Sequence, residues 1–338
     1  MNILLDAFGG DHAPLEAIKG ARLAADTFKD VHIMLVGDTA KIEDCAKENK
    51  IDIKDIIILQ AGDVLTMEDE PTSVLKAKPD SSLAVGFKAL KDGKADAFVT
   101  AGNTGAVVVG GTLIVKRMKG VKRPALTSTI PCATGDYLLM DMGANVECKP
   151  DMLQQFAIMG SVYMEQICGI QNPRVGLANI GVESHKGTPL QQEAYKLLQK
   201  APINFIGNAE VRDVPFGVAD VVVADGFTGN IMLKLTEGLA KMFAGELKGI
   251  MKKNALTKLG ALTMLGGVNE FKNKLDYKKK GGAPLLGVAK PVIKAHGSSD
   301  AEAFKNAVGQ AITMVKTDMI GTIERYLEQA NKAVAEDK

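Results

Sequence analysis

Short apolar runs alternate with longer amphipathic segments along most of the chain. Runs of this kind, bounded by polar loops that contain glycine, indicate strands. The predicted strands are Ile3–Leu5, His32–Val36, Ile56–Leu59, Ala97–Thr100, Ala125–Ile130, Tyr137–Met140, Arg174–Ile180, Ile203–Ile206 and Asp220–Ala224. Helices are predicted between them, including Pro14–Phe28, Ser81–Lys91, Asp151–Cys168 and Pro189–Gln199. This alternation predicts a layered α/β fold with a mostly parallel sheet.

One amphipathic helix is predicted near the C-terminus, with apolar residues at spacings of four and three. They are Phe304, Val308, Ile312, Val315, Met319, Ile323 and Tyr326. A single apolar stripe indicates a helix packed on the core. Because no long linker, low-complexity tract or internal repeat interrupts the chain, residues 1–338 are predicted to form one α/β unit.

Residues 248–280 are strongly basic, with nine lysines and two acidic residues, although the whole chain has a net charge of +1. We interpret them as a helical hairpin with an apolar tip at Leu262–Val268 and lysine-rich legs. Three roles stay open for this hairpin. It could pack a dimer, bind a membrane with its apolar tip and lysines, or bind an acidic protein through the lysines.

The composition excludes several classes of protein. A chain that is 46% hydrophobic and 24% charged is globular, and a net charge of +1 does not suggest a nucleic-acid partner. The longest apolar stretch, Ala106–Val115, is too short to span a bilayer. The four cysteines show no C-x-x-C spacing, so neither a zinc site nor a redox pair is indicated. With no signal peptide after Met1, we expect a cytoplasmic protein.

The most informative loop follows the predicted strand that ends at Ala224. It reads Asp-Gly-Phe-Thr-Gly-Asn over residues 225–230 and leads into a helix that carries Lys234. Glycines let backbone N–H groups approach a ligand closely, and a helix N-terminus favours an anion there. Asn230 and Lys234 lie four residues apart, on one face of the helix. These features predict a site for an anionic group such as phosphate.

Five further polar loops that contain glycine follow predicted strands or precede helices. They are Asp6–Pro14, Asn103–Gly105, Asp141–Asn145, Gly181–Gly187 and His296–Asp300. Ligands of open α/β sheets bind at the carboxyl edge of the strands, so we expect the six loops to meet in one site. The candidate substrate-binding residues are Gly9, Gly10, Asp11, Asn103, Thr104, Gly105, Asp141, Asn145, Asp225, Thr228, Gly229, Lys234, Ser298 and Ser299.

The ordered motifs resemble those of bacterial phosphate acyltransferases, the acyl-acyl-carrier-protein:phosphate transacylases of phospholipid synthesis. They are Gly9–Pro14, Ala101–Ala106, Asp225–Asn230 and Gly282–Gly287, followed by His296–Ser299. The resemblance runs from Met1 to about the final helix. Two departures are Phe8, where methionine is expected, and Val182, where an acidic residue is usual.

This resemblance implies an α/β/α layered fold related to phosphate acetyltransferases and isocitrate-type dehydrogenases. It also implies a homodimer, an acyl carrier protein and inorganic phosphate as substrates, and a peripheral association with membrane. We assign the membrane contact to residues 256–271 of the projecting hairpin.

Acyl transfer from a thioester to phosphate requires orientation of the phosphate and donors to the carbonyl oxygen. Phosphate is already anionic, so no Ser-His-Asp triad is needed. The candidate catalytic residues are Lys186 and Asn230, as donors, and His12 or His296, as the proton donor to the departing thiol. No metal and no cofactor are expected, because the four histidines have no metal-ligand spacing.

Two other functions stay open. A decarboxylating dehydrogenase of the isocitrate type would share the fold, but its metal-binding acids and nicotinamide loop are not found in the sequence. A non-catalytic scaffold that binds acyl carrier protein or membrane is the second alternative. Turnover of acyl carrier protein with phosphate would exclude the scaffold.

Overall fold

The strands form one mixed sheet at the centre of the molecule. The computed structural model describes residues 1–275 and 281–336, except the side chains of 265, 269, 271–275 and 333–336. Eleven strands within the described residues pair in the order β3-β2-β1-β4-β11-β10-β5-β6-β9-β7-β8. Their bounds are β1 (Asn2–Asp6), β2 (His32–Gly37), β3 (Ile57–Gln60), β4 (Ala97–Thr100), β5 (Ala125–Cys132), β6 (Gly135–Met140), β7 (Arg174–Asn179), β8 (Asn204–Glu210), β9 (Val221–Val223), β10 (Ala283–Leu286) and β11 (Val292–Lys294).

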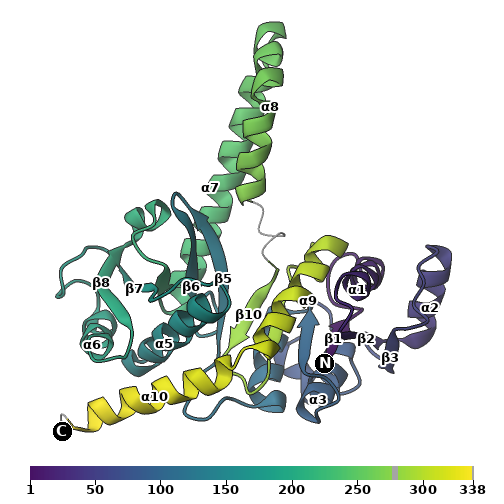
Figure 1. Cartoon of the computed structure of the whole chain (residues 1–338), viewed down its shortest axis with the longest axis horizontal. Coiled ribbons are helices and arrows are strands. Elements are labelled where there is room, and N and C mark those ends of the chain that lie inside the picture. The colour runs from purple at the N-terminus through teal and green to yellow at the C-terminus, as the bar shows by residue number, and fades with distance from the viewer. Residues whose placement is uncertain (276–280, 337–338) are drawn as a thin grey trace.

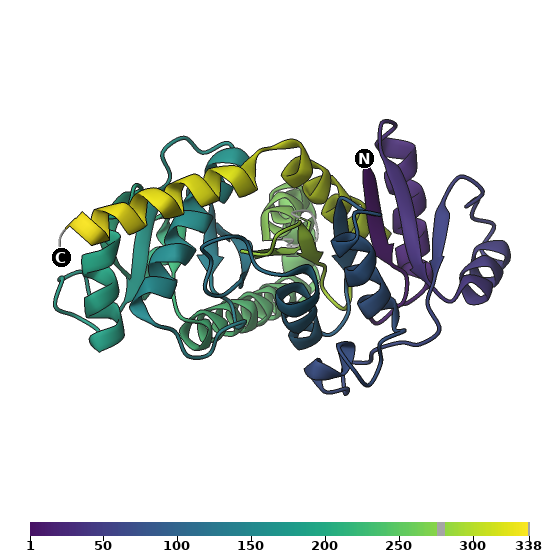
Figure 2. The ribbon, with the colours of Figure 1, turned by 90° about the horizontal axis from the view of Figure 1, so that it is seen from below.

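Helices cover both faces of the sheet, as Figures 1 and 2 show. Their bounds are α1 (Leu15–Thr27), α2 (Thr39–Glu48), α3 (Ser82–Lys91), α4 (Thr104–Gly110), α5 (Pro150–Gln166), α6 (Pro189–Leu198), α7 (Gly226–Lys252), α8 (Ala255–Leu275), α9 (Ala301–Lys316) and α10 (Met319–Glu336). Successive residues of a strand point to opposite faces. In β1, Ile3 and Leu5 pack in a core with α1, α5 and α9, whereas Leu4 packs in a core with α3 and α4. The α/β/α layering predicted from the sequence is therefore confirmed.

The sequence analysis missed two short strands, β10 and β11, and the direction of the sheet reverses beyond them, between β5 and β6. β10 runs antiparallel to β11 and to β5, and β5 runs antiparallel to β6. The end of β11 at Lys294 pairs with the start of β10, whereas the end of β6 at Met140 pairs near the start of β5. The carboxyl ends of β1, β4 and β11 thus lie at one edge, and those of β6, β9 and β7 lie at the opposite edge. The expectation that all six loops share one carboxyl edge is wrong.

The predicted C-terminal helix is two helices. α9 ends at Lys316, the backbone of Thr317 is extended, and α10 begins at Met319. α9 packs on α1, and α10 crosses to α5 in the other half of the sheet, as seen in Figure 2. The prediction that the seven apolar residues lie on one continuous helix is therefore wrong. The break at Thr317 and Asp318 lets its apolar residues cover two separated parts of the core.

The basic segment belongs to a longer hairpin, formed by α7 and α8, that projects from the sheet (Figure 1). Its turn lies at Lys253 and Asn254, so the tip predicted at 262–268 and the start predicted at 248 are wrong. Asn254 fixes the turn, because its Oδ1 accepts the N–H of Thr257 (2.9 Å) and its own N–H is donated to Thr257 Oγ1 (3.0 Å). The glycines at 266 and 267 stay inside α8, since a helical glycine costs only about 1 kcal/mol.

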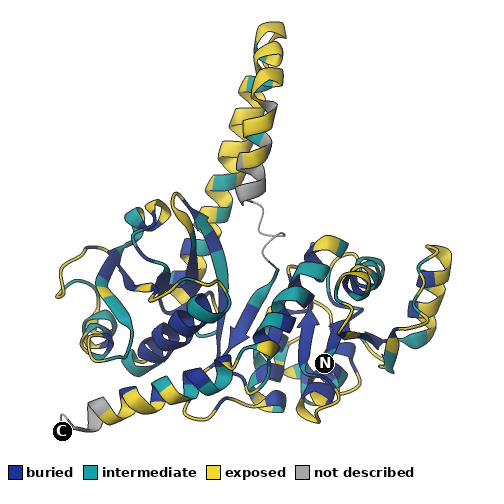
Figure 3. Ribbon diagram, viewed as in Figure 1, coloured by how far each residue is buried: buried dark blue, intermediate teal, exposed yellow. Residues whose placement is uncertain are grey.

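Much of the hairpin is exposed, as the yellow ribbon of Figure 3 shows, and many of its exposed side chains are apolar. Within α7 these side chains recur every four residues over most of its length. They are Phe227, Ile231, Leu235, Leu239, Phe243 and Leu247, each at least 38% exposed. We call this set the α7 stripe. An apolar stripe of this length on a single chain indicates a surface that is covered by something else.

Candidate functional site

The loops after β1, β4 and β11 form one cluster, which we call the first loop cluster (residues 6–12, 100–105 and 294–300). The buried Asp6 carboxylate accepts hydrogen bonds from Thr100 Oγ1 (2.7 Å) and from the N–H of Phe8 (3.0 Å). Thr100 Oγ1 also accepts the N–H of Gly102 (3.0 Å). Burial raises the pKa of Asp6, and these hydrogen bonds oppose that rise. Asp6 therefore ties two of the predicted loops together.

Two glycines let the loops of this cluster approach closely. A Cβ atom on Gly9 would lie 2.7 Å from the backbone nitrogen of Gly102, and Gly10 has a φ of +102°. The exposed Asp11 donates its backbone N–H to the carbonyl of Gly297 (2.8 Å). This bond joins the loop after β1 to the loop after β11.

His296 is oriented by the loop that contains it. Its Nδ1 accepts the backbone N–H of Ser298 (3.2 Å), and Ser298 Oγ lies 3.0 Å from the same atom. Because Nδ1 accepts a hydrogen bond, the neutral ring carries its proton on Nε2. Partial burial, and then the charge of Lys294, lowers the pKa of His296. Both effects favour a neutral imidazole whose Nε2–H is a donor.

The other predicted residues of this cluster lie around the same loops. His12 is exposed, and its carbonyl accepts the N–H of Glu16 (3.3 Å). Ser299 is buried and donates its N–H to the carbonyl of His296 (3.0 Å). Thr104 is exposed. Gly105 lies so close to the loop before α3 that a Cβ atom would be 2.6 Å from Pro71.

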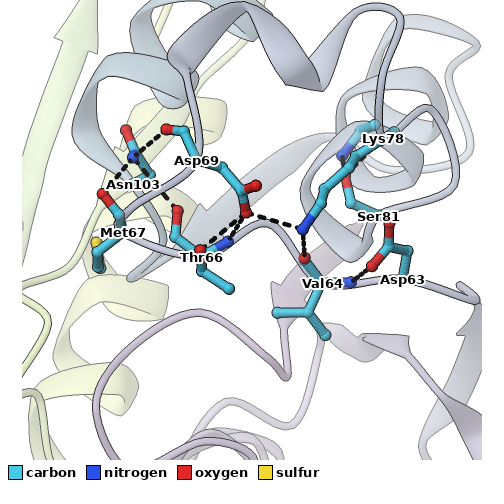
Figure 4. A network of polar contacts seen from close by, with 9 residues as sticks. Asp63, Val64, Thr66, Met67, Asp69, Lys78, Ser81 and Asn103 are labelled. Carbon is cyan, nitrogen blue, oxygen red and sulfur yellow. Dashed lines mark hydrogen bonds and ion pairs between the residues drawn. The ribbon is translucent and has the colours of Figure 1, made fainter.

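The side chain of Asn103 is occupied by structural hydrogen bonds. Its Oδ1 caps α4 by accepting the N–H of Ala106 (3.1 Å). Its Nδ2 lies 3.2–3.4 Å from three carbonyl oxygens of the loop 66–69 (Figure 4). The carboxylate of Asp69, at the end of this loop, accepts a hydrogen bond from Nζ of Lys78 (2.8 Å). This hydrogen bond is the main cause that lowers the pKa of Asp69 to about 2. The substrate contact predicted for Asn103 stays a prediction.

Replacing Asn103 by alanine should therefore lower the free energy of unfolding by about 1–2 kcal/mol, since an N-cap and a loop tether are lost together. Urea unfolding would measure the change. The matched control is Asp38→Ala, which removes the cap of α2, where Asp38 accepts the N–H of Lys41 (3.2 Å). An equal loss in both variants would mean that the tether to 66–69 adds nothing.

The second loop cluster (residues 141–148 and 225–230) lies at the opposite edge. The carboxylate of Asp141 is fully buried and accepts the N–H groups of Leu126 (3.0 Å), Ala144 (3.2 Å) and Asn145 (2.7 Å). It also accepts Nδ2 of Asn145 (3.0 Å). Burial raises the pKa of Asp141 and the hydrogen bonds oppose that rise. Asp141 is therefore the organising residue of this cluster.

The N-terminus of α7 docks on that loop. Asp225 caps the helix, because its carboxylate accepts the N–H (2.9 Å) and Oγ1 (2.7 Å) of Thr228. The N–H of Gly226 is donated to the carbonyl of Asn145 (2.8 Å). A Cβ atom on Gly229 would lie 1.8 Å from the carbonyl oxygen of Asp141. Two glycines thus permit direct contact of the helix with the loop.

The exposed Asn230 lies beside the same loop, where a Cβ atom on Gly143 would be 3.5 Å from its amide group. Lys186 lies on a neighbouring loop, since β7 pairs with β9 next to the start of α7. Its carbonyl accepts Nδ2 of Asn179 (3.1 Å), and its N–H is donated to the carbonyl of Glu183 (3.1 Å). Within the described residues, no hydrogen bond or ion pair joins Lys186 to either cluster.

Helix α7 connects the two clusters across the sheet. It starts in the second cluster and passes back over the face that carries α3 and α4, where Met232 is buried. Glu237 and Lys234 then lie close enough to His296 to shift its pKa in opposite directions. Lys234 also forms an ion pair with Glu237 (3.0 Å). The candidate site therefore lies along the first three turns of α7.

Sequence reasoning missed one charged residue of this site, Lys294, which ends β11 and is only 8% exposed. Its signal was present, as a lysine two residues before His296, but β11 itself was not predicted. In the part of the chain that the structure describes, no group of three or more His, Cys, Asp or Glu side chains is arranged to hold a metal ion. Nor does any helix there have the length and apolar character needed to cross a bilayer.

Comparison with known proteins gives close sequence relatives. The family model described as fatty acid synthesis protein matches residues 1–322. The phosphate acyltransferase of Alkaliphilus oremlandii is 49% identical over 320 residues, 95% of each chain. That of Thermoanaerobacterium thermosaccharolyticum is 46% identical over 97% of each chain. A phosphotransacetylase from Streptococcus pyogenes aligns with a TM-score of 0.62 at 16% identity, covering 96% of this chain and 94% of that one, which supports the fold alone.

Proposed function

Because the chain belongs to the fatty acid synthesis protein family, we propose that it is a phosphate acyltransferase that moves a fatty acyl group from acyl-acyl-carrier-protein to inorganic phosphate. The observation that carries this function is the match to phosphate acyltransferases at 44–49% identity over nearly the whole chain. The geometry supports it, since the site combines glycine-rich loops, lysines and a neutral histidine.

The reaction joins an oxygen of hydrogen phosphate to the carbonyl carbon of the thioester. The C–O bond forms as the C–S bond breaks, and the proton of hydrogen phosphate is finally carried by the released thiol. The products are acyl-phosphate, for phospholipid synthesis, and free acyl carrier protein. Neither a metal nor a nucleotide takes part in this proposal. Activity that EDTA abolishes and a divalent ion restores would contradict the absence of a metal.

His296, which faces α7, is the proton donor in this proposal. Its imidazolium form gives the Nε2 proton to the departing thiolate, and the proton of hydrogen phosphate restores that form; the lowered pKa of His296 makes the imidazolium a stronger acid. The exposed His12 is the alternative donor. Lys186 and Asn230 stabilise negative charge on the carbonyl oxygen, where the loss of one donor typically costs about 3 kcal/mol of transition-state stabilisation. The N–H groups of Gly226 and Gly229 are already donated to Asn145 and Asp225, so the backbone N–H groups around the phosphate come from the first loop cluster in this proposal.

Mass spectrometry of the products tests this function. Incubation of acyl-acyl-carrier-protein with phosphate should yield acyl-phosphate, and omission of phosphate should stop release of the carrier. Release of free fatty acid at the same rate with and without phosphate would contradict the proposal.

The α7 stripe is the contact surface of a homodimer in this proposal. Its exposed side chains from Phe227 to Leu247 continue for about five turns, which is the length of an interhelical seam. A second copy of α7 would bury them. Burial of apolar area contributes about 25 cal/mol per Å².

The tip of the hairpin is the peripheral membrane contact, so that the protein is cytoplasmic but membrane-associated. Leu256 and Leu259 are 78% and 63% exposed. Lys252, Lys253 and Lys258 lie around the turn. Apolar side chains would enter the lipid while each lysine adds about 1 kcal/mol on an anionic surface. An acidic carrier protein is the alternative partner of these lysines.

Changing both Leu256 and Leu259 to glutamate should abolish sedimentation with anionic vesicles, because apolar burial is lost and negative charge is added. Turnover of the protein free of vesicles should be unchanged. The control pair Ile57→Glu and Met67→Glu carries the same charge change at positions 56% and 52% exposed outside the hairpin, and should still sediment.

Sedimentation equilibrium of both pairs separates the alternatives. If the variant with Leu256→Glu and Leu259→Glu were a monomer, and the parent did not bind vesicles, the tip would be a dimer contact and not a membrane contact. A raised KM for acyl carrier protein, again with no vesicle binding by the parent, would assign the tip to the carrier.

A further inference from the structure

Lys294 is a buried cation with very few partners. Its side chain is more than nine-tenths buried, and its Nζ donates one hydrogen bond, at 2.5 Å, to the carbonyl of the adjacent Ala295. Among the described residues, no carboxylate forms an ion pair with it. An ammonium group has three donors, so two remain without a partner.

Such a group is unfavourable for folding by itself. An ammonium ion taken out of water is normally paired or replaced by an apolar side chain, because desolvation of an unpaired charge is expensive. Burial accordingly lowers the pKa of Lys294 to about 8, and the more distant Asp11 opposes that shift. A buried charge without a counter-charge suggests that the counter-charge belongs to a ligand.

The position of Lys294 agrees with a ligand. It pairs in register with Thr100 at the carboxyl end of β4, so both side chains lie on the face of the sheet that carries α4 and α7. The chain then turns into the loop of His296, and Asp11 reaches within 3.1 Å of a Cβ built on Gly297. Lys294 thus lies buried inside the first loop cluster, two residues before His296, whose pKa Lys234 influences.

We propose that the ammonium group of Lys294 binds the oxygens of the phosphate acceptor and holds it beside His296. This inference rests on the function proposed above and names the residue that binds the acceptor. The phosphate would supply the counter-charge that the protein lacks. In this proposal Lys294 contacts only the phosphate, and other residues bind the acyl carrier protein and the acyl chain.

The test compares Lys294→Met with the parent enzyme and with Lys290→Met, a matched control before the other end of β11. Losing a charged hydrogen bond should raise the KM for phosphate by about 10- to 100-fold in Lys294→Met, with the KM for acyl-acyl-carrier-protein unchanged. Lys290→Met should leave both constants unchanged. An unchanged KM for phosphate in Lys294→Met would overturn the proposal.

Thermal unfolding gives a readout that does not depend on turnover. Without phosphate, Lys294→Met should unfold at a higher temperature than the parent, because an unpaired buried charge is removed. Added phosphate should raise the unfolding temperature of the parent but not of Lys294→Met. A lower unfolding temperature with an intact response to phosphate would make Lys294 structural. If Lys294→Met does not fold, the same comparison is made with Lys294→Gln.

The two proposals fail separately. A parent that makes no acyl-phosphate refutes the function, whereas a parent that makes it, together with a Lys294→Met variant of normal phosphate affinity, refutes only the assignment of Lys294.

The pH dependence of phosphate affinity gives a further test of Lys294. Phosphate affinity of the parent should fall above about pH 8, as Lys294 loses its proton, and Lys294→Met should lack this fall. Both proteins share the charged groups of this region: Asp11 and His296 interact with Lys294, and Lys234 and Glu237 interact with His296.

Discussion

Gly229→Ala is expected to abolish acyl transfer and to lower the free energy of unfolding by about 3 kcal/mol or more. A Cβ atom at this position would lie 1.8 Å from the carbonyl oxygen of Asp141. Since the obstacle is backbone, no rotamer change relieves it, and the start of α7 has to move away from the loop. A displacement of about 1 Å in a catalytic arrangement can lower the rate about 100-fold. Urea unfolding and the acyl-phosphate assay measure the two effects.

Gly238→Ala is the matched control, since it lies in the same helix and no atom would lie within 4 Å of the added Cβ. This variant should gain up to about 1 kcal/mol, because alanine favours the helix more than glycine does. Its activity should be that of the parent. If Gly229→Ala also kept its stability and its rate, the close docking of α7 on the second loop cluster would be wrong.

Asp141→Asn is expected to lower the free energy of unfolding by about 3–5 kcal/mol, although the two side chains have nearly the same shape. The carboxylate accepts four hydrogen bonds, two on each oxygen. An amide replaces one oxygen by an NH₂ group, which then faces N–H donors. The loop 141–148 would lose its anchor, and with it the seat of α7, so the acyl transfer rate should fall as well.

Asp26→Asn is the control for this prediction. Asp26 is 58% exposed and forms an ion pair with Arg22 (2.9 Å) on the surface of α1. Its loss should change the free energy of unfolding by less than about 1 kcal/mol. Equal effects of the two substitutions in urea unfolding would show that the buried hydrogen bonds of Asp141 are not special.

Both predictions depend on where a short loop meets a helix, and this is where sequence reasoning was partly successful. The motif from Asp225 to Asn230 predicted a strand that leads into a helix, and the structure contains both. Its glycines were predicted to let a ligand approach, whereas Gly226 and Gly229 let α7 dock on the loop after β6. Asp141 was predicted to be a substrate-binding residue. Its four hydrogen bonds to Leu126, Ala144 and Asn145 could not be predicted, because they depend on the path of the backbone after β6 and on the pairing of β6 with β5.

The sequence by itself determined the layered architecture, because strand and helix periodicity and the glycine-containing loops are local properties. The nine strands predicted between Ile3 and Ala224 are all present within one or two residues at most boundaries. Its motifs also determined the family. The basic hairpin was recognised, but its turn was misplaced, since a cap at Asn254 outweighed the two glycines at 266 and 267.

Only the tertiary structure decided how the loops are grouped. β10 and β11 are too short to give a periodic signal, and β10 lies antiparallel to both of its neighbours, so that β5 has the direction of β11. The antiparallel pair β5 and β6 then sends the carboxyl ends of the two halves to opposite edges. Helix α7 then brings Lys234 close enough to influence the pKa of His296, although the two residues are 62 positions apart in the sequence. The burial of Lys294 likewise depends on strands β4 and β10 on either side of it. Strand direction and burial are set by long-range pairing, and for that reason a reading of local pattern cannot supply them.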